Sequence, residues 1–421
     1  MQPEELFGTL LPLGESWRVM AVTHQESERR FVIEIEESDQ LWRHERCPRD
    51  EGKVRLYDHA PSRQWRHLNV FNHECVLQCA LPRSKCQNCG HVYRVRPPWE
   101  GKGKHFSKEF EAFALTLCRE MPVKKASDIL GESDQSLWRM LKAYVREGHQ
   151  QLDMSAVTCV GVDEMSIRKG HCYASVFADL KARRVLYATE GKDHTVWERF
   201  AQELGRHNSH PDRILHVSMD MSAAYQKGVR EHCGNARITY DKFHLIAKAN
   251  QAVDEVCRNE RHRGGPEASG QLKQTRWLWR KNPQNLTQRQ QRHMDTLDHE
   301  MLQTSQAYQL KLQLQNIYQI PYRSWAKRRL LAWCRHIHSK VQSAWRGLLN
   351  PMGKLARTVE RHLDGILSHW DSHVTNAYME GLNSVFSATK RKARGYRSTE
   401  NLITMLYFVA GKLDIPSTRY H

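Results

Sequence analysis

The sequence predicts an α/β core on a mixed sheet, interrupted by an all-helical insertion and preceded by two small modules. Three observations predict this class. Within residues 155–260, short runs of apolar and β-branched residues alternate with amphipathic helices. Residues 261–355 are rich in Gln, Arg and Trp and offer no strand candidate. Upstream of residue 150, two cysteines with metal-ligand spacing and two short helices around a glycine indicate separate modules.

The charge balance points to a polyanionic partner. The 421 residues include 64 Lys and Arg against 47 Asp and Glu, which leaves a formal net charge of +17. Such a surplus usually faces nucleic acid, with well-solvated surface charge as the alternative. The sequence has no long apolar run and no secretion signal, so we expect no membrane partner. Eleven Cys, mostly single within apolar segments, suit reduced thiols in a cytoplasm.

Two segments precede the helical part of the N-terminal half. Residues 1–45 are predicted to form a short helix and a strand pair, because 16–25 and 29–38 show period-two alternation. Residues 46–98 contain short strands and the knuckle-like stretch KCQNCGHVY. We interpret them as a zinc-ribbon-like DNA-binding module.

Residues 105–150 are predicted to form a helix-turn-helix DNA-binding domain. Two apolar-periodic pieces are separated by Gly131, as this motif requires. An ordinary helical hairpin is the alternative, and the position just upstream of the core favours the motif. Side chains of the second helix would face the major groove, with lysines near phosphates. The candidate DNA contacts are Lys124, Lys125, Gln135, Ser136, Arg139 and Lys142.

The first part of the core, residues 155–260, begins with a buried strand and a hairpin. A helix, a strand, a helix, a strand and a longer helix follow. The predicted strands span 157–164, 171–180, 183–191, 214–221 and 236–241. This order is that of the RNase H-like fold, and the helices predicted within 356–421 would form the second part of the core.

The all-helical insertion at 261–355 carries two Trp residues among cations. Trp277 and Trp279 are flanked by Arg276, Arg280 and Lys281. Such a cluster suits stacking on a displaced base or gripping the nucleic-acid backbone. Because Trp in helices is usually in the core, we expect at least one of the two to be buried.

Two aspartates are the first candidates for catalysis. Asp163 and Asp220 each stand where a predicted buried strand ends, and the two strands should be neighbours. Strand ends are where open α/β sheets bind ligands, although a single Asp there is more often a turn residue. Mg²⁺ prefers carboxylate oxygens, and phosphodiester cleavage uses two divalent cations about 4 Å apart. Glu164 should point to the other face of the sheet and is left out.

Glu380 is the candidate third ligand, on a helix expected to pack against the sheet. One polar face of this helix holds Asn376, Glu380, Asn383 and Ser387, while positions such as Val385 can face the core. A basic run follows and could hold the phosphate backbone next to the cations. It contains Lys390, Arg391, Lys392 and Arg394.

Four segments carry a resemblance to a known family. They are GVDEMSIRKGHCYASVFADL, VSMDMSAAYQKGV, YDKFHLIAKANQAVDEV and NAYMEGLNSVFSATKRKARGYRSTENLITMLYF. They resemble the DDE transposases of the insertion-sequence family called ISL-three, and the similarity extends over residues 46–421. The resemblance implies a bacterial, nucleoid-associated enzyme that uses Mg²⁺ or Mn²⁺, with Asp163, Asp220 and Glu380 as metal ligands. It would cleave DNA at element ends and join the freed 3′-hydroxyl to a target.

The same family carries a D-x-x-H element, matched here by Asp241 and His244. His244 could contact the scissile phosphate or orient a water, and a His that only holds Asp241 as a helix cap is the alternative. Transposition would require double-stranded DNA with terminal inverted repeats, target DNA, and a homodimer or higher oligomer that holds two ends. A silent DNA-binding regulator and an RNase H-like nuclease or resolvase are the rival functions. The intact carboxylates disfavour the first, and the accessory modules disfavour the second.

The knuckle Cys86-Gln87-Asn88-Cys89 has the spacing of a zinc site. The resembled family has a second C-x-x-C upstream, where this sequence has Cys47-Pro48-Arg49-Asp50. Zinc accepts a carboxylate oxygen, so a structural Zn²⁺ remains compatible with the sequence. His59 or His67 could replace Asp50, and a ribbon without metal is the rival. The candidate zinc ligands are Cys47, Asp50, Cys86 and Cys89.

Overall fold

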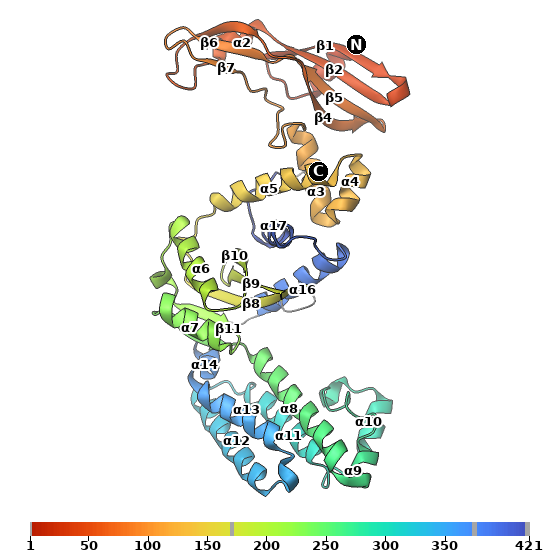
Figure 1. Ribbon diagram of the computed structural model, residues 1–421, viewed down its shortest axis with the longest axis vertical. Coiled ribbons are helices and arrows are strands. Elements are labelled where there is room, and N and C mark those ends of the chain that lie inside the picture. The colour runs from red at the N-terminus through yellow and green to blue at the C-terminus, as the bar shows by residue number, and fades with distance from the viewer. Residues whose placement is uncertain (1, 169–171, 373–376, 417–421) are drawn as a thin grey trace. The chain divides into compact units, whose positions relative to one another are not determined.

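The computed structural model describes residues 2–168, 172–372 and 377–416. The chain divides into two compact units, 1–152 with 387–421, and 153–386. Figure 1 shows both units, with many of their elements labelled. Within the described residues, no helix combines the length and the apolar character needed to cross a membrane.

Two sheets form the N-terminal half of the first unit (Figure 1). One has the order β1-β2-β5-β4 and packs around the buried Ile33, Trp65 and Trp99, and the other has the order β3-β6-β7. The segment 1–45 therefore shares a sheet with part of the expected ribbon module, because β2 pairs in parallel with β5. The elements are α1 (Pro3–Leu10), β1 (Trp17–Gln25), β2 (Arg30–Glu37), α2 (Asp39–His44), β3 (Val54–His59), β4 (Arg63–Val70), β5 (His73–Cys79), β6 (Pro82–Cys86) and β7 (Val92–Arg94).

Four helices complete the first unit. The turn between α4 and α5 is the predicted one, since Gly131 has a φ of 70°, which glycine adopts without steric cost. The apolar side of α17 packs against α5, so residues 387–416 cluster with this unit, whereas the sequence grouped 356–421 with the core. The helices are α3 (Lys108–Glu120), α4 (Val123–Leu130), α5 (Asp134–Gln150) and α17 (Thr399–Ala410).

The second unit is built on a five-stranded mixed sheet of order β10-β9-β8-β11-β12. β9 is antiparallel to both neighbours, whereas β8, β11 and β12 run parallel. The order of strands and helices along the chain, three strands followed by alternating helices and strands, is the predicted one. They are β8 (Cys159–Arg168), β9 (Cys172–Asp179), β10 (Arg184–Glu190), α6 (Thr195–Arg206), β11 (His216–Met219), α7 (Ala223–His232), β12 (Arg237–Tyr240) and α8 (Lys242–Arg263).

Residues 261–355, all within the described part, contain helices and turns but no strand. α11 and α13 pack on α8, and α12 packs on both α11 and α13 (Figure 1). The stretch 272–281, expected to be helical, forms a succession of turns, because Gln274 has a φ of 63° and interrupts the helical hydrogen bonding. The remaining helices are α9 (Gly265–Gln271), α10 (Gln288–Asp295), α11 (Gln303–Ile317), α12 (Arg323–Ser343), α13 (Asn350–Arg361), α14 (Leu363–Leu367), α15 (His369–Ser372) and α16 (Ala377–Lys392).

Candidate active site and DNA-binding modules

Asp163 and Asp220 lie on neighbouring strands at the same level of the sheet. The parallel pairing of β11 with β8 ends at Ser218 and Gly161, two residues before each aspartate. Asp220 follows the end of β11, as the sequence predicts. The prediction that Asp163 ends its strand is wrong, because antiparallel pairing with β9 continues β8 to Arg168. Asp163 lies instead two residues beyond the point where the pairing of β8 with β11 ends.

Asp241 and His244 join this pair from the next strand. Asp241 follows β12, and its Oδ1 accepts a hydrogen bond from the Phe243 amide at 2.9 Å, so it caps α8. This cap fixes the first turn of α8, which carries His244. Nε2 of His244 lies 3.8 Å from Asp163 Oδ1 and 3.8 Å from Asp241 Oδ2. The imidazole therefore stands between two carboxylates at ion-pair distance, beyond a hydrogen bond.

Asn383 of α16 contacts the catalytic candidate Asp163, although the sequence-based site did not include it. Its Nδ2 donates a hydrogen bond to Asp163 Oδ2 at 2.6 Å. The signal in the sequence was its place three residues after Glu380 on the same helix face. Asn376, expected on that face, lies outside the described residues. Val385, expected in the core, is 43% exposed.

Glu380 lies at another side of the same cluster. Its charge interacts with those of Asp241, Lys242 and His244. Its Oε1 is buried and has no hydrogen-bond partner among the described residues. α16 lies very close to β8, since a Cβ on Gly161 would come within 2.8 Å of Met379 Cγ. This close packing positions Glu380 and the neighbouring amide at the carboxylates.

The site carries a surplus of negative charge. Burial raises the pKa of Asp163, and the charge of Asp220 raises it further, against the lowering effect of Asn383. Burial and Asp220 raise the pKa of Glu164. Burial and Asp241 raise the pKa of Glu380. Within the described residues, oxygens of Asp163, Asp220 and Glu380 do not all come within 4.8 Å of one another, which limits the repulsion between like charges.

Divalent cations fit this donor set. Hard cations such as Mg²⁺ prefer carboxylate oxygens, and the buried Glu380 Oε1 is an oxygen without a hydrogen-bond partner among the described residues. The raised pKa values of Asp163 and Glu380 indicate that charging them here costs free energy. A bound cation would offset this cost.

A second cluster of ligand type lies in the first unit. Cys47, Asp50, Cys86 and Cys89 offer ligand atoms that all lie within 4.8 Å of one another. Cys47 Sγ lies 3.7 Å from Cys89 Sγ, and Asp50 Oδ1 lies 3.3 Å from Cys86 Sγ. Hydrogen bonds from Cys47, the Gly52 amide and Cys86 lower the pKa of Asp50 to about 2. The carboxylate thus stays ionised, as a metal ligand must.

Two histidines considered as replacement ligands are engaged elsewhere. His59 Nε2 lies 2.8 Å from Glu37 Oε1, and His67 Nδ1 lies 2.7 Å from Ser107 Oγ. Neither belongs to the four-residue cluster. The geometry therefore favours Asp50 over both histidines as the fourth ligand.

Candidate DNA contacts on the helix-turn-helix differ in their surroundings. Gln135 and Arg139 are exposed on α5, and Arg139 Nη2 donates to Ser136 Oγ at 3.2 Å. These three side chains lie in the first two turns of α5, the part of a recognition helix that contacts base edges in this motif.

Two of the candidate lysines of this domain, Lys124 and Lys142, take part in ion pairs. Lys124 lies 2.8 Å from Asp128 on the same helix, next to the exposed Lys125. Lys142 Nζ lies 2.6 Å from Glu400 of α17, so this lysine helps to hold two helices of the unit together. The exposed Lys124–Asp128 pair contributes little stability and can exchange for phosphate.

The basic run expected near phosphates occupies the end of α16. Lys390, Arg391 and Lys392 lie in its last turn, and Arg394 follows with a φ of 53°. Lys392 Nζ donates to the Glu120 carbonyl at 3.3 Å. The run is thus on the helix that also carries Glu380.

The two Trp candidates differ in exposure. Trp277 is 62% exposed, with the guanidinium carbons of Arg276 and Arg280 at 5.6 and 5.0 Å from its ring centre. Trp279 is fully buried, and its Nε1 donates to Thr275 Oγ1 at 3.1 Å. The DNA-binding prediction for Trp279 is wrong, because a side chain enclosed in the helical core cannot reach nucleic acid.

A basic cavity of about 720 Å³ lies beside β12 and was not predicted from the sequence. Asp371 pairs with Arg237, and its Oδ2 lies 3.0 Å from Arg323 Nε. Burial and nearby cations, Arg361 among them, lower the pKa of His362. The cavity is lined by Arg230, Arg237, Arg323, Arg361 and His362, among others.

Three family models match the chain in succession. A zinc-finger model of the transposases IS204/IS1001/IS1096/IS1165 matches residues 42–89. A helix-turn-helix model of transposase family ISL3 matches residues 95–145. The DDE model of the same family, described as a transposase, matches residues 160–406, which is more than half of the chain.

Curated relatives match over most of their length. The transposase for insertion sequence element IS1001 of Bordetella parapertussis is 26% identical over 362 residues, which cover 84% of this chain and 86% of that protein. The transposase for element IS1557 of Mycobacterium tuberculosis is 26% identical over 407 residues, with 89% and 88% covered.

Proposed function

We propose, since the chain belongs to the ISL3 family of DDE transposases, that it cleaves DNA at the ends of an insertion sequence and transfers the freed strand to target DNA. The observation that carries this proposal is the convergence of Asp163 on β8, Asp220 after β11 and Glu380 on α16. The strand order supports an RNase H-like core, and the helices of 261–355 would be an insertion in it.

The three carboxylates would hold two divalent cations, Mg²⁺ or Mn²⁺. Such cations, when bound, stabilise the attacking and leaving oxygens of a phosphodiester displacement. Asn383 fixes Asp163 through the hydrogen bond to its Oδ2. Asp241 caps α8 and thereby directs His244, which can orient a water or contact the scissile phosphate.

The first unit would supply DNA recognition. Exposed Gln135 and Arg139, with Ser136, suit base edges, while Lys124, Lys125 and Lys142 suit phosphates. A Zn²⁺ held by the cluster of three Cys and Asp50 would stabilise the small sheet β3-β6-β7. In the second unit, the arginine-lined cavity and the exposed Trp277 would hold the backbone.

Strand joining requires two element ends at once, so the working species would be a homodimer or a higher oligomer. It would act on double-stranded DNA at terminal inverted repeats and at the target, in the nucleoid of the bacterial cytoplasm. The net charge of +17 suits this setting.

Cleavage of labelled end DNA in Mg²⁺ or Mn²⁺ tests the catalytic assignment. The wild type should nick the DNA at the element end, and Asp220→Asn should lose this activity while retaining DNA binding. A matched control is Asp212→Asn, which changes an exposed Asp on the 3-10 helix Pro211–Arg213, in the same unit. Equal nicking by Asp220→Asn would refute the assignment. DNA binding without nicking by the wild type would favour a regulator.

The zinc content of the purified chain tests the ribbon. We expect about one zinc per chain, lost in Cys86→Ser and Cys89→Ser. His59→Ala should retain the metal, because His59 faces Glu37 and lies outside the cluster. Zinc loss in His59→Ala, or no zinc in the wild type, would contradict the proposed ligand set.

A further inference from the structure

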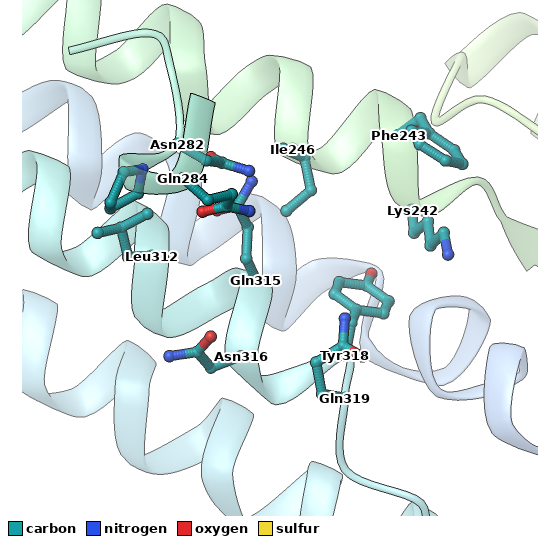
Figure 2. A pocket seen from close by; sticks show the side chains of 11 residues that line it. Lys242, Phe243, Ile246, Asn282, Gln284, Leu312, Gln315, Asn316, Tyr318 and Gln319 are labelled. Carbon is teal, nitrogen blue, oxygen red and sulfur yellow. The ribbon is translucent and has the colours of Figure 1, made fainter. Parts of the chain in front are cut away.

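A polar pocket opens beside the candidate active site. It has a volume of about 450 Å³, within the usual range of small-ligand sites, and lies between the start of α8, the 3-10 helix Pro283–Asn285 and the end of α11. Figure 2 shows its lining side chains. Five of them are carboxamides, namely Asn282, Gln284, Gln315, Asn316 and Gln319.

The pocket is connected to the catalytic cluster through the first turn of α8. Lys242 and Phe243 line the pocket and stand between Asp241 and His244 in the chain. The charge of Lys242 also acts on Glu380. A group bound in the pocket would therefore be a close neighbour of the phosphate at the catalytic carboxylates.

The side chains that line the pocket suit a neutral, planar ligand that can form hydrogen bonds along several of its edges. Carboxamides can donate and accept at once, and they pair in bidentate fashion with base edges. Two aromatic rings are available for contact with a flat ligand. Phe243 is 47% exposed, and Tyr318 is held by stacking on Trp370 at a centroid distance of 5.2 Å. Among the described residues, Lys242 is the one cation that lines the pocket, so a free phosphate is a poor fit.

We propose that this pocket receives one unpaired nucleobase of the DNA strand, next to the scissile phosphate. The inference rests on the proposed function, because the DNA strand must first reach the catalytic carboxylates. Taking a base out of its stack costs free energy, which hydrogen bonds and aromatic contact in the pocket would offset. Holding that base would fix the adjacent phosphate for attack.

The test uses end DNA carrying 2-aminopurine at one position at a time around the cleavage site. The fluorescence of 2-aminopurine increases when the base leaves the stack. When the Asp220→Asn protein binds, one position of the DNA should therefore show increased fluorescence. This variant is used because it should leave the DNA uncut. In the same background, Gln284→Ala and Gln315→Ala should weaken DNA binding about 5- to 10-fold and reduce the signal. An abasic site at the responding position should abolish the difference between these variants and their parent.

The matched control is Gln313→Ala, an exposed Gln of α11 that does not line the pocket. The base-binding proposal is overturned if the pocket variants match this control in DNA affinity and fluorescence, or if no position shows increased fluorescence. Nicking by the wild type, measured in parallel, separates the base-binding proposal from the proposed function. If the wild type nicks the DNA but no position shows increased fluorescence, only the base-binding proposal fails. If free deoxynucleoside monophosphates bind equally well to the pocket variants and to their parent, the proposal is also overturned.

Discussion

Asn383 determines how the carboxylate of Asp163 is presented. Its Nδ2 hydrogen bond occupies one oxygen of Asp163, and His244 approaches the other at 3.8 Å. A carboxylate held in this way loses less conformational freedom when it binds a cation. Asn383 is therefore a positioning residue for the proposed metal ligand Asp163.

Asn383→Ala should lower the nicking rate about 10- to 100-fold and raise the Mg²⁺ concentration needed for half-maximal rate. The Mg²⁺ titration is the measurement that separates positioning from a general loss of stability. Gln and Asp variants serve as controls: Asn383→Gln should recover part of the activity, whereas Asn383→Asp should not, because its charge repels Asp163. An unchanged Mg²⁺ requirement in Asn383→Ala would contradict this role.

Lys311 is fully buried in the helical part of the second unit. Burial lowers its pKa to about 8, while its Nζ donates to the Trp279 carbonyl at 3.2 Å. In the unfolded chain a Lys has a pKa of about 10.4. The folded state therefore binds fewer protons between about pH 8 and 10.4, and its stability should rise with pH across that window.

Lys311→Met should remove this pH dependence. At pH 7 the variant should be as stable as the wild type or more stable, because it no longer buries a charged ammonium group. The stability of the wild type relative to the variant should then increase by about 2–3 kcal/mol as the pH rises from 7 to 10. Amide hydrogen exchange of α11 peptides, compared at equal pH, measures this local stability. A constant difference between the two proteins would show that Lys311 keeps its ordinary pKa.

At the scale of elements, the contact between α16 and β8 assembles the site. A Cβ at Gly161 would meet Leu180 Cδ2 at 2.7 Å and Met379 Cγ at 2.8 Å. Gly161→Ala should thus displace α16, destabilise the unit by about 1–3 kcal/mol and lower nicking. Met379→Ala, made in the same chain, should restore part of the activity by making room. A double-mutant cycle on rate and stability tests this, and simple additivity would exclude the contact as the cause.

The element order of the second unit was predictable because each strand has a local signature of β-branched and apolar residues. Strand ends were less predictable, because they depend on partners: β8 continues past Asp163 only through β9. The expectation that at least one of the two Trp residues in the turn-rich stretch 272–281 is buried is confirmed, but which of them is buried was not predictable. Trp277 and Trp279 have similar neighbours in sequence, and the stretch folds as turns around the left-handed Gln274, so no regular helix face assigns one ring to the core.

At the scale of the whole molecule, the C-terminal helix α17 belongs to the same compact unit as the N-terminal residues. The amphipathic pattern of α17 predicts a buried face but does not say what covers it. In the structure this face packs on the helix-turn-helix unit, where Arg119 lies 5.0 Å from the Phe408 ring centre and Lys142 pairs with Glu400. The first unit, which holds the helix-turn-helix, therefore depends on residues from both the N-terminal and the C-terminal parts of the sequence.

A fragment of residues 1–152 should consequently be unstable on its own. It would expose the surface that α17 covers with buried side chains such as Leu402, Leu406 and Phe408. Each such side chain contributes about 1.5–3 kcal/mol when fully buried, so the loss should reach several kcal/mol. Joining 387–416 to the fragment through a flexible Gly/Ser linker should restore a cooperative thermal transition and binding of end DNA. Equal melting temperatures for the two fragments would mean that α17 does not support this unit.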